Sequence, residues 1–251
     1  MGLTYNPFKL EGKTVLITGA SSGIGRSASI ECSKFGAKVV LTGRNEERLK
    51  ETLSQMEGEG HITIAADLNN EKDIQMIAEN CPSLDGVVNN AGVGSTKPIA
   101  FFNTKDISTV YQANTFAPML LIRWLLKKKK IQARCSLVFT SSISSKLPFP
   151  GNGIYGSSKA ALEIYTKYCA LELANKGIRA NSVHPGMIET KLIHGGALAE
   201  EDLKNDLAKY PLGRYGKPEE IAWQIVYLLS DASQWVTGTS VVIDGGLSIN
   251  Y

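Results

Sequence analysis

The chain has 251 residues, of which 43% are hydrophobic and 20% are charged. This length fits one large α/β domain or two small ones, and the composition excludes a disordered or fibrous protein. The 27 Lys and Arg residues against 24 Asp and Glu residues give a net charge of +3, which is too small to indicate a nucleic-acid partner.

The sequence carries no membrane or metal signal. Its longest apolar stretch, residues 119–126, is interrupted by Arg123 and is far shorter than the roughly 20 residues that a transmembrane helix needs. The first ten residues contain no continuous apolar stretch, so we do not expect a secretory signal. The four cysteines form no Cys-x-x-Cys pair, which argues against zinc and against a disulfide framework. We therefore expect a cytoplasmic protein with no metal, no membrane and no nucleic acid among its partners.

Seven short apolar runs are expected to form strands. The first, residues 14–18, ends in a glycine cluster that opens a helix near Ile24. The alternation of runs and helical stretches predicts an α/β fold, a doubly wound Rossmann-type parallel sheet with helices on both faces. No linker or repeat divides the chain, so we predict a single domain over residues 1–251. The other runs are 38–42, 62–66, 84–88, 136–140, 178–183 and 240–243, with helices expected from about Glu46 and Glu71.

The loop after the first run has the sequence TGASSGIG, residues 18–25. In an open parallel sheet, ligands bind beyond the carboxyl ends of the strands. Gly19, Gly23 and Gly25 let the backbone approach a pyrophosphate, and the N–H groups at the start of the next helix can bind it. The spacing is Gly-x-x-x-Gly-x-Gly, not Gly-x-Gly-x-x-Gly. A glycine-rich turn without function is the alternative, which the flanking strand and helix disfavour.

The second run ends at Thr42-Gly43-Arg44, where NAD-binding folds usually offer an acidic residue to the adenosine ribose. No carboxylate stands there, and Arg44 can hold a 2′-phosphate through charge-assisted hydrogen bonds. The sequence therefore favours NADP(H) over NAD(H), with a solvated arginine as the alternative. After the third run, Asp67 can hold the adenine edge or cap the helix that follows.

Residues suited to proton chemistry follow the fourth and fifth runs. Asn114 stands four residues before Pro118, which has no N–H to donate to the Asn114 carbonyl. That carbonyl can bind a water in a proton relay, or the kink has no role. Tyr155 and Lys159 lie at i and i+4 on one helix face.

A phenol titrates near pH 10, so its use near neutrality needs roughly 4 kcal/mol of help, which the charge of Lys159 is placed to give. In a reduction, Tyr155 would donate a proton to a carbonyl oxygen that Ser142 polarises. Tyr and Lys pairs at this spacing also occur by chance, and the upstream serine strengthens the functional interpretation.

With TGASSGIG, NNAG at 89–92, Asn114, Ser142 and Tyr155-x-x-x-Lys159 in that order, the chain resembles the shorter, classical branch of the short-chain dehydrogenase/reductase family, over about residues 13–246. It is similar in particular to 3-oxoacyl-[acyl-carrier-protein] reductases, including the ending LGRYGKPEE at 212–220. The resemblance implies that Asn114, Ser142, Tyr155 and Lys159 form the catalytic tetrad. The residues expected to bind the cofactor are Gly19, Ser21, Ser22, Gly23, Ile24, Gly25, Arg44, Asp67, Leu68, Asn90, Ala91, Gly92, Tyr155, Lys159, Pro185, Gly186, Ile188 and Thr190.

The resemblance also implies an NADPH-dependent reductase that converts a ketone to a secondary alcohol. The favoured substrate is a 3-oxoacyl thioester on acyl-carrier protein, in fatty acid biosynthesis. A dehydrogenase of a sugar, polyol or other small carbonyl compound is the alternative, and a non-catalytic NADP-sensing protein is a further one. A homotetramer or homodimer is expected, with a substrate lid at about residues 191–211.

Two features leave alternatives open. The basic residues 127–130, with Arg134 and Lys176, can meet an acidic carrier protein, or they are solvated cations at a helix end. The family commonly has Asn before the Pro185-Gly186 pair, where this chain has His184, which we interpret as a packing or loop residue and not as a catalytic base.

Overall fold

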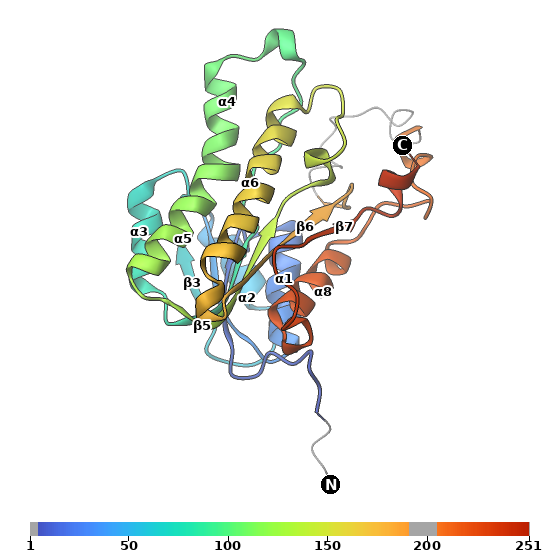
Figure 1. Ribbon diagram of the computed structural model, residues 1–251. Helices are drawn as coiled ribbons and strands as arrows, with labels where there is room; N and C mark the ends of the chain where they lie inside the picture. Colours follow the sequence, from blue (N-terminus) through green and yellow to red (C-terminus); the bar gives the residue numbers. More distant parts are fainter. Residues whose placement is uncertain (1–4, 191–204, 251) are drawn as a thin grey trace.

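The computed structural model describes residues 5–190 and 205–250 of the chain. Within them, seven parallel strands form one sheet in the order β3-β2-β1-β4-β5-β6-β7, which confirms the predicted architecture (Figure 1). The strand order reverses between β1 and β4, so the loops that follow these two strands run to opposite sides and leave a crevice at the carboxyl ends. The strands are β1 (Thr14–Thr18), β2 (Lys38–Gly43), β3 (Ile62–Ala65), β4 (Leu84–Asn89), β5 (Ile131–Thr140), β6 (Arg179–Pro185) and β7 (Ser240–Ile243).

The central strands are apolar because both of their faces are covered. Val15, Leu16 and Ile17 of β1 are fully buried, and they pair with β4 from Val15↔Gly86 to Ile17↔Val88. Strand β5 begins at Ile131, five residues before the predicted start at 136, and pairs there with Leu84. The residues from 132 to 134 are exposed and lie in an irregularity of the pairing between Leu84↔Ile131 and Gly86↔Ser136, so an apolar pattern cannot reveal them.

Helices cover both faces of the sheet (Figure 1). On one face, Ala28, Leu49 and Ile225 join a buried cluster that includes Val15, and on the other face Ile77, Leu121 and Leu162 join a second cluster. The helix starts expected at Glu46 and Glu71 are confirmed. The first face carries α1 (Gly23–Lys34), α2 (Glu46–Leu53) and α8 (Pro218–Leu229), and the second carries α3 (Glu71–Asn80), α5 (Ala117–Lys127) and α6 (Gly153–Glu172), with α4 (Thr104–Tyr111) beside α6.

An irregular turn joins α4 to α5. Residues Gln112–Phe116 form a π-helical turn, and Pro118 follows in the first turn of α5. π-Turns inside helices are frequent at functional sites, because the widened turn re-aims a side chain. Here the turn carries the fully buried side chain of Asn114.

The described part of the chain contains no helix that is long and apolar enough to cross a membrane. It also contains no group of three or more His, Cys, Asp or Glu side chains suited to a metal ion. Of the expected lid, residues 191–204 lie outside the described residues. In its last part, the buried Tyr210 accepts a hydrogen bond from the backbone N–H of Met187 at 3.2 Å, which joins this segment to the loop after β6.

Candidate active site

A cleft of about 700 Å³ lies at the carboxyl ends of the strands, next to the point where the strand order reverses. This volume suits a cofactor-sized ligand. The cleft is lined by every residue expected to bind the cofactor except Gly25, and by every residue of the expected tetrad except Asn114. A second cavity, of about 450 Å³, lies at the opposite ends of the strands beside Thr14 and Lys38, and none of the expected site residues lines it.

Gly25 lies directly behind the cleft and keeps its first loop compact. A Cβ atom on Gly25 would lie 2.3 Å from the carbonyl oxygen of Gly19 and 2.6 Å from Nδ2 of Asn90. Gly19 and Gly23 have φ angles of +67° and +51°, which favour glycine. The cleft therefore has a glycine-lined wall that a phosphate group can approach closely, so the residues present fit a dinucleotide.

Thr18, at the end of β1, ties this wall to the NNAG loop. Its hydroxyl accepts hydrogen bonds from the backbone N–H groups of Asn90 at 2.9 Å and Ala91 at 3.0 Å. The same hydroxyl donates to the carbonyl of Val88 at 3.3 Å. The sequence analysis missed this residue. The available signal was a polar, β-branched side chain at the end of an otherwise apolar strand.

The end of the cleft beside β2 is basic. Arg26, Arg44 and Arg48 all line it, and Arg44 is exposed there. The interpretation of Asp67 as a helix cap is wrong. Asn70 caps α3 by accepting a hydrogen bond from the N–H of Lys72, because the turn after β3 places residue 70 at the helix start.

Asp67 lies within that turn. Its carboxylate accepts a hydrogen bond from the N–H of Asn69 at 3.0 Å, and the residue remains in the lining of the cleft.

Asn114 does not line the cleft, but it holds the loop after β4, whose residue Val93 does line it. Its Oδ1 accepts a hydrogen bond from the N–H of Val93 at 2.8 Å, and its Nδ2 donates to the carbonyl of Val93 at 2.9 Å and to Ser158 Oγ at 3.1 Å. The π-turn thereby connects the loop after β4 to α6. A water bound at the Asn114 carbonyl stays a prediction.

Ser142, Tyr155 and Lys159 meet at the inner end of the cleft. Ser142 follows β5 and lines the cleft together with Tyr155 of α6, and its side chain acts to lower the pKa of that phenol. Nζ of Lys159 lies 5.8 Å from the centroid of the Tyr155 ring and donates to the carbonyl of Thr140 at 2.8 Å. The structure thus brings together three residues that the sequence placed on two separate elements.

The expected lowering of the Tyr155 pKa by Lys159 is not found. Burial raises the pKa of Tyr155 above its usual value, and the hydrogen bond with Ser142 only partly opposes this effect. Burial also lowers the pKa of Lys159 to about 8. Lys159 is buried and Tyr155 is half-buried, so the cost of removing charge from water outweighs the attraction that the sequence spacing suggested. At neutral pH the phenol is therefore protonated.

Comparison with known proteins supplies the family. A family profile described as enoyl-(acyl carrier protein) reductase matches residues 19–248, which is nearly the whole chain. The chain belongs to the short-chain dehydrogenase/reductase family. It is 34% identical to a 3-oxoacyl-[acyl-carrier-protein] reductase, FabG, of Thermotoga maritima over 96% of this chain and 100% of that protein. It is 30% identical to a cyclopentanol dehydrogenase of Comamonas testosteroni over 96% and 99% of the two chains.

Solved structures agree with this membership. The structure titled Pseudomonas aeruginosa RhlG/NADP active-site complex has a TM-score of 0.89 and 29% identity to this chain, and the match covers 97% of this chain and 99% of that one. As a short-chain dehydrogenase/reductase, the protein is an oxidoreductase acting on CH–OH groups, in a family that uses NAD(P)(H) and small carbonyl substrates. The relatives named above act on different substrates, so the substrate and the choice of cofactor are matters for proposal.

Proposed function

We propose that this short-chain dehydrogenase/reductase is an NADPH-dependent ketone reductase, and that its substrate is a 3-oxoacyl thioester on acyl-carrier protein, in fatty acid biosynthesis. The observation that carries the reductase proposal is the half-buried, protonated Tyr155, which lines the inner end of the cleft together with Ser142 and Lys159. The similarity to the Thermotoga maritima reductase supports the thioester.

The residues of the cleft suit proton delivery to a ketone oxygen. NADPH, when bound, supplies the hydride that the carbonyl carbon accepts. Tyr155 is protonated at neutral pH, so its O–H can donate a proton to the carbonyl oxygen as negative charge develops there. The Ser142 hydroxyl, held beside Tyr155, polarises the same oxygen. Lys159, mostly protonated below pH 8, would hold the ribose hydroxyls of the bound cofactor and adds positive charge behind the phenol.

The cofactor proposal rests on the adenosine end of the cleft. The glycine-lined wall formed by Gly19, Gly23 and Gly25 would hold the pyrophosphate, and Ile188 and Thr190 would seat the nicotinamide end. The exposed guanidinium of Arg44 has Gly43 beside it in place of an acidic residue, which favours the 2′-phosphate of NADP(H).

A substrate panel tests the proposed reaction. NADPH oxidation is followed with acetoacetyl thioesters of coenzyme A and acyl-carrier protein, and with cyclopentanone, sugars and other small ketones under the same conditions. The thioesters should give the highest kcat/KM. Inactivity on every thioester, with turnover of another ketone, would overturn the thioester assignment and favour the second candidate. That candidate is a dehydrogenase of a small carbonyl compound, supported by the similarity to cyclopentanol dehydrogenase.

The proposed assembly is a homotetramer or homodimer. Ile164, Tyr168 and Leu171 lie exposed along α6, and an apolar helix face of this kind is typical of a subunit interface. Light scattering of the purified protein at micromolar concentration should give the mass of a dimer or tetramer, and a monomer would contradict the proposal.

The remaining proposals concern compartment and carrier protein. All four cysteines of the chain are free and buried, which supports a reducing, cytoplasmic compartment.

In the basic run at residues 127–130, Lys128 pairs with Glu79 at 2.7 Å and Nζ of Lys127 lies 4.6 Å from the Trp124 ring. These contacts favour a solvated helix end over a carrier-protein surface.

A further inference from the structure

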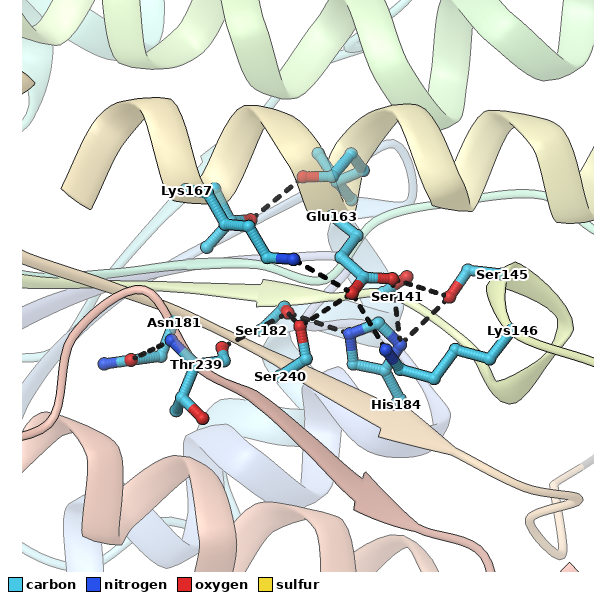
Figure 2. Close-up of polar contacts among 12 residues, drawn as sticks. Ser141, Ser145, Lys146, Glu163, Lys167, Asn181, Ser182, His184, Thr239 and Ser240 are labelled. Carbon is cyan, nitrogen blue, oxygen red and sulfur yellow. Dashed lines mark hydrogen bonds and ion pairs between the residues drawn. The ribbon is translucent and has the colours of Figure 1, made fainter. Parts of the chain in front are cut away.

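A polar cluster built around the buried Ser182 and His184 lies behind the loop that carries Ser142, and none of its members lines the cleft (Figure 2). Its residues come from the loop after β5, from α6, from β6 and from β7, so the cluster links four parts of the fold. We name it the Glu163–His184 cluster, and it consists of Ser145, Lys146, Glu163, Ser182, His184 and Ser240.

His184 contacts the Ser142 backbone directly. The imidazole is fully buried near the end of β6, as the packing interpretation predicted. Its Nδ1 lies 3.2 Å from the carbonyl oxygen of Ser142 and 3.1 Å from Ser145 Oγ, and its Nε2 lies 2.8 Å from Ser182 Oγ. A carbonyl oxygen only accepts hydrogen bonds, so Nδ1 carries the proton and Nε2 accepts from the Ser182 hydroxyl.

Glu163 anchors the other side of the cluster, one helical turn after Lys159. Its Oε2 accepts a hydrogen bond from Ser145 Oγ at 3.1 Å, and its Oε1 accepts from Lys146 at 2.9 Å and from Ser240 at 2.9 Å. Figure 2 shows Lys146, Ser145, Ser240 and His184 arranged around the carboxylate. The side chain of Ser145 thus links the carboxylate of Glu163 to the ring of His184.

Burial keeps the ring of His184 neutral. Burial lowers the pKa of His184 to about 4, and the positive charges of Lys146 and Lys159 oppose the attraction of Glu163. Burial acts to raise the pKa of Glu163, but the hydrogen bonds from Lys146 and Ser240 hold it at about 2. Lys167, whose Nζ lies 3.7 Å from Glu163, adds a further positive charge beside the carboxylate. The protonation pattern of the cluster therefore stays constant at neutral pH.

We propose that His184 and Glu163 are positioning residues for Ser142: through the Ser142 carbonyl and the Ser145 hydroxyl they hold this loop so that the Ser142 side chain stays in the cleft that Tyr155 also lines. The inference rests on the proposed role of Ser142 in polarising the substrate oxygen. Ser142 also caps the 3-10 turn Ile143–Ser145 by accepting the N–H of Ser144 at 3.1 Å, so the loop is fixed from both ends. A displacement of about 1 Å in such a group can cost about 100-fold in rate.

The test compares turnover on any ketone that the wild-type enzyme reduces. His184→Leu removes the N–H donor at similar volume, and Ser145→Ala removes only the linking hydroxyl. Each should lower kcat, by about tenfold or more for His184→Leu, while the dissociation constant of NADPH changes by less than about twofold. His184→Asn, which keeps an N–H donor, should recover part of the kcat. The matched control is Ser136→Ala, which removes a buried 2.7 Å hydrogen bond to the Leu228 carbonyl on the remote part of β5 and should leave kcat unchanged.

A spectroscopic measurement keeps the test independent of turnover. The long-range ¹⁵N–¹H spectrum of the full-length protein should show His184 neutral and protonated at Nδ1 between pH 6 and 8, and an Nε2-protonated ring would overturn the inference. Wild-type kcat in both His184→Leu and Ser145→Ala would also overturn it. If His184→Leu does not fold, the kcat values of Ser145→Ala and Glu163→Gln decide: lowered values support the inference, and wild-type values in both overturn it. A wild-type protein inactive on every ketone would contradict the proposed function instead, which separates the two failures.

Discussion

Replacing His184 should change how the stability of this protein depends on pH. In the unfolded chain an imidazole takes up a proton near pH 6.5, whereas the pKa of the buried His184 is about 4. Between these values the unfolded state binds a proton that the folded state does not, so the free energy of unfolding falls as the pH falls. The difference between the two pKa values corresponds to a loss of at most about 3 kcal/mol, of which about 2 kcal/mol is lost by pH 5.

Glu163 affects the free energy of unfolding over a separate range of pH. Its pKa of about 2 in the fold lies below that of a carboxyl in the unfolded chain, near 4.5. The stability that this carboxylate contributes is therefore present above pH 4.5 and is lost as the pH falls toward 2. Because the two windows hardly overlap, the range from pH 7.5 to 5.0 reports on His184 and not on Glu163.

Urea unfolding at pH 7.5 and 5.0, at fixed protein concentration, measures the effect. In His184→Asn the loss of unfolding free energy between the two pH values should be smaller than in the wild type by about 2 kcal/mol. Ser136→Ala, the matched control, should be destabilised equally at both pH values. An equal pH-dependent loss in His184→Asn and wild type would refute the reasoning, because it would mean that the ring titrates alike in both states.

Three further changes test the cleft. Tyr155→Phe should lower turnover by about 100-fold or more while NADPH still binds, as measured by fluorescence titration, because only the proton donor is lost. Arg44→Ala should lower kcat/KM for NADPH by about tenfold or more and leave NADH unaffected; an unchanged preference contradicts the 2′-phosphate role. Gly25→Ala should abolish NADPH binding and lower the Tm, because its Cβ would lie 2.3 Å from a backbone oxygen, whereas Gly153→Ala, with its nearest neighbour at 3.9 Å, should change neither.

The sheet was predictable from the sequence because its core strands are buried on both faces. The buried run 14–18 coincides with β1, and the half-buried run 240–243 at the edge of the sheet coincides with β7. The first part of β5 was not predictable, since only Ile131 of residues 131–134 pairs with β4 and the other three side chains are exposed. The single-domain organisation stays a prediction.

The candidate site was predictable where its residues lie close together in the sequence. Tyr155 and Lys159 follow from helical spacing, and the glycine loop from its place after a strand. Links between distant segments were not predictable. Thr18 binds the backbone of Asn90, 72 positions away, and no local pattern records such a pair. The same holds for the link between Ser142 and the histidine of β6, 42 positions apart, because only the sheet brings them together.

The prediction that Lys159 lowers the pKa of Tyr155 shows what the spacing of residues in a sequence does not reveal. Sequence spacing gives the proximity of Lys159, from which a lowered pKa followed, but it does not give the cost of removing both groups from water. With that cost included, the phenol begins as an acid and the lysine is the group whose pKa moves toward neutrality. An acid is what the reduction of a ketone requires, whereas oxidation of an alcohol requires the phenolate. Proton donation by Tyr155 is therefore the step that the proposed ketone reduction asks of this side chain.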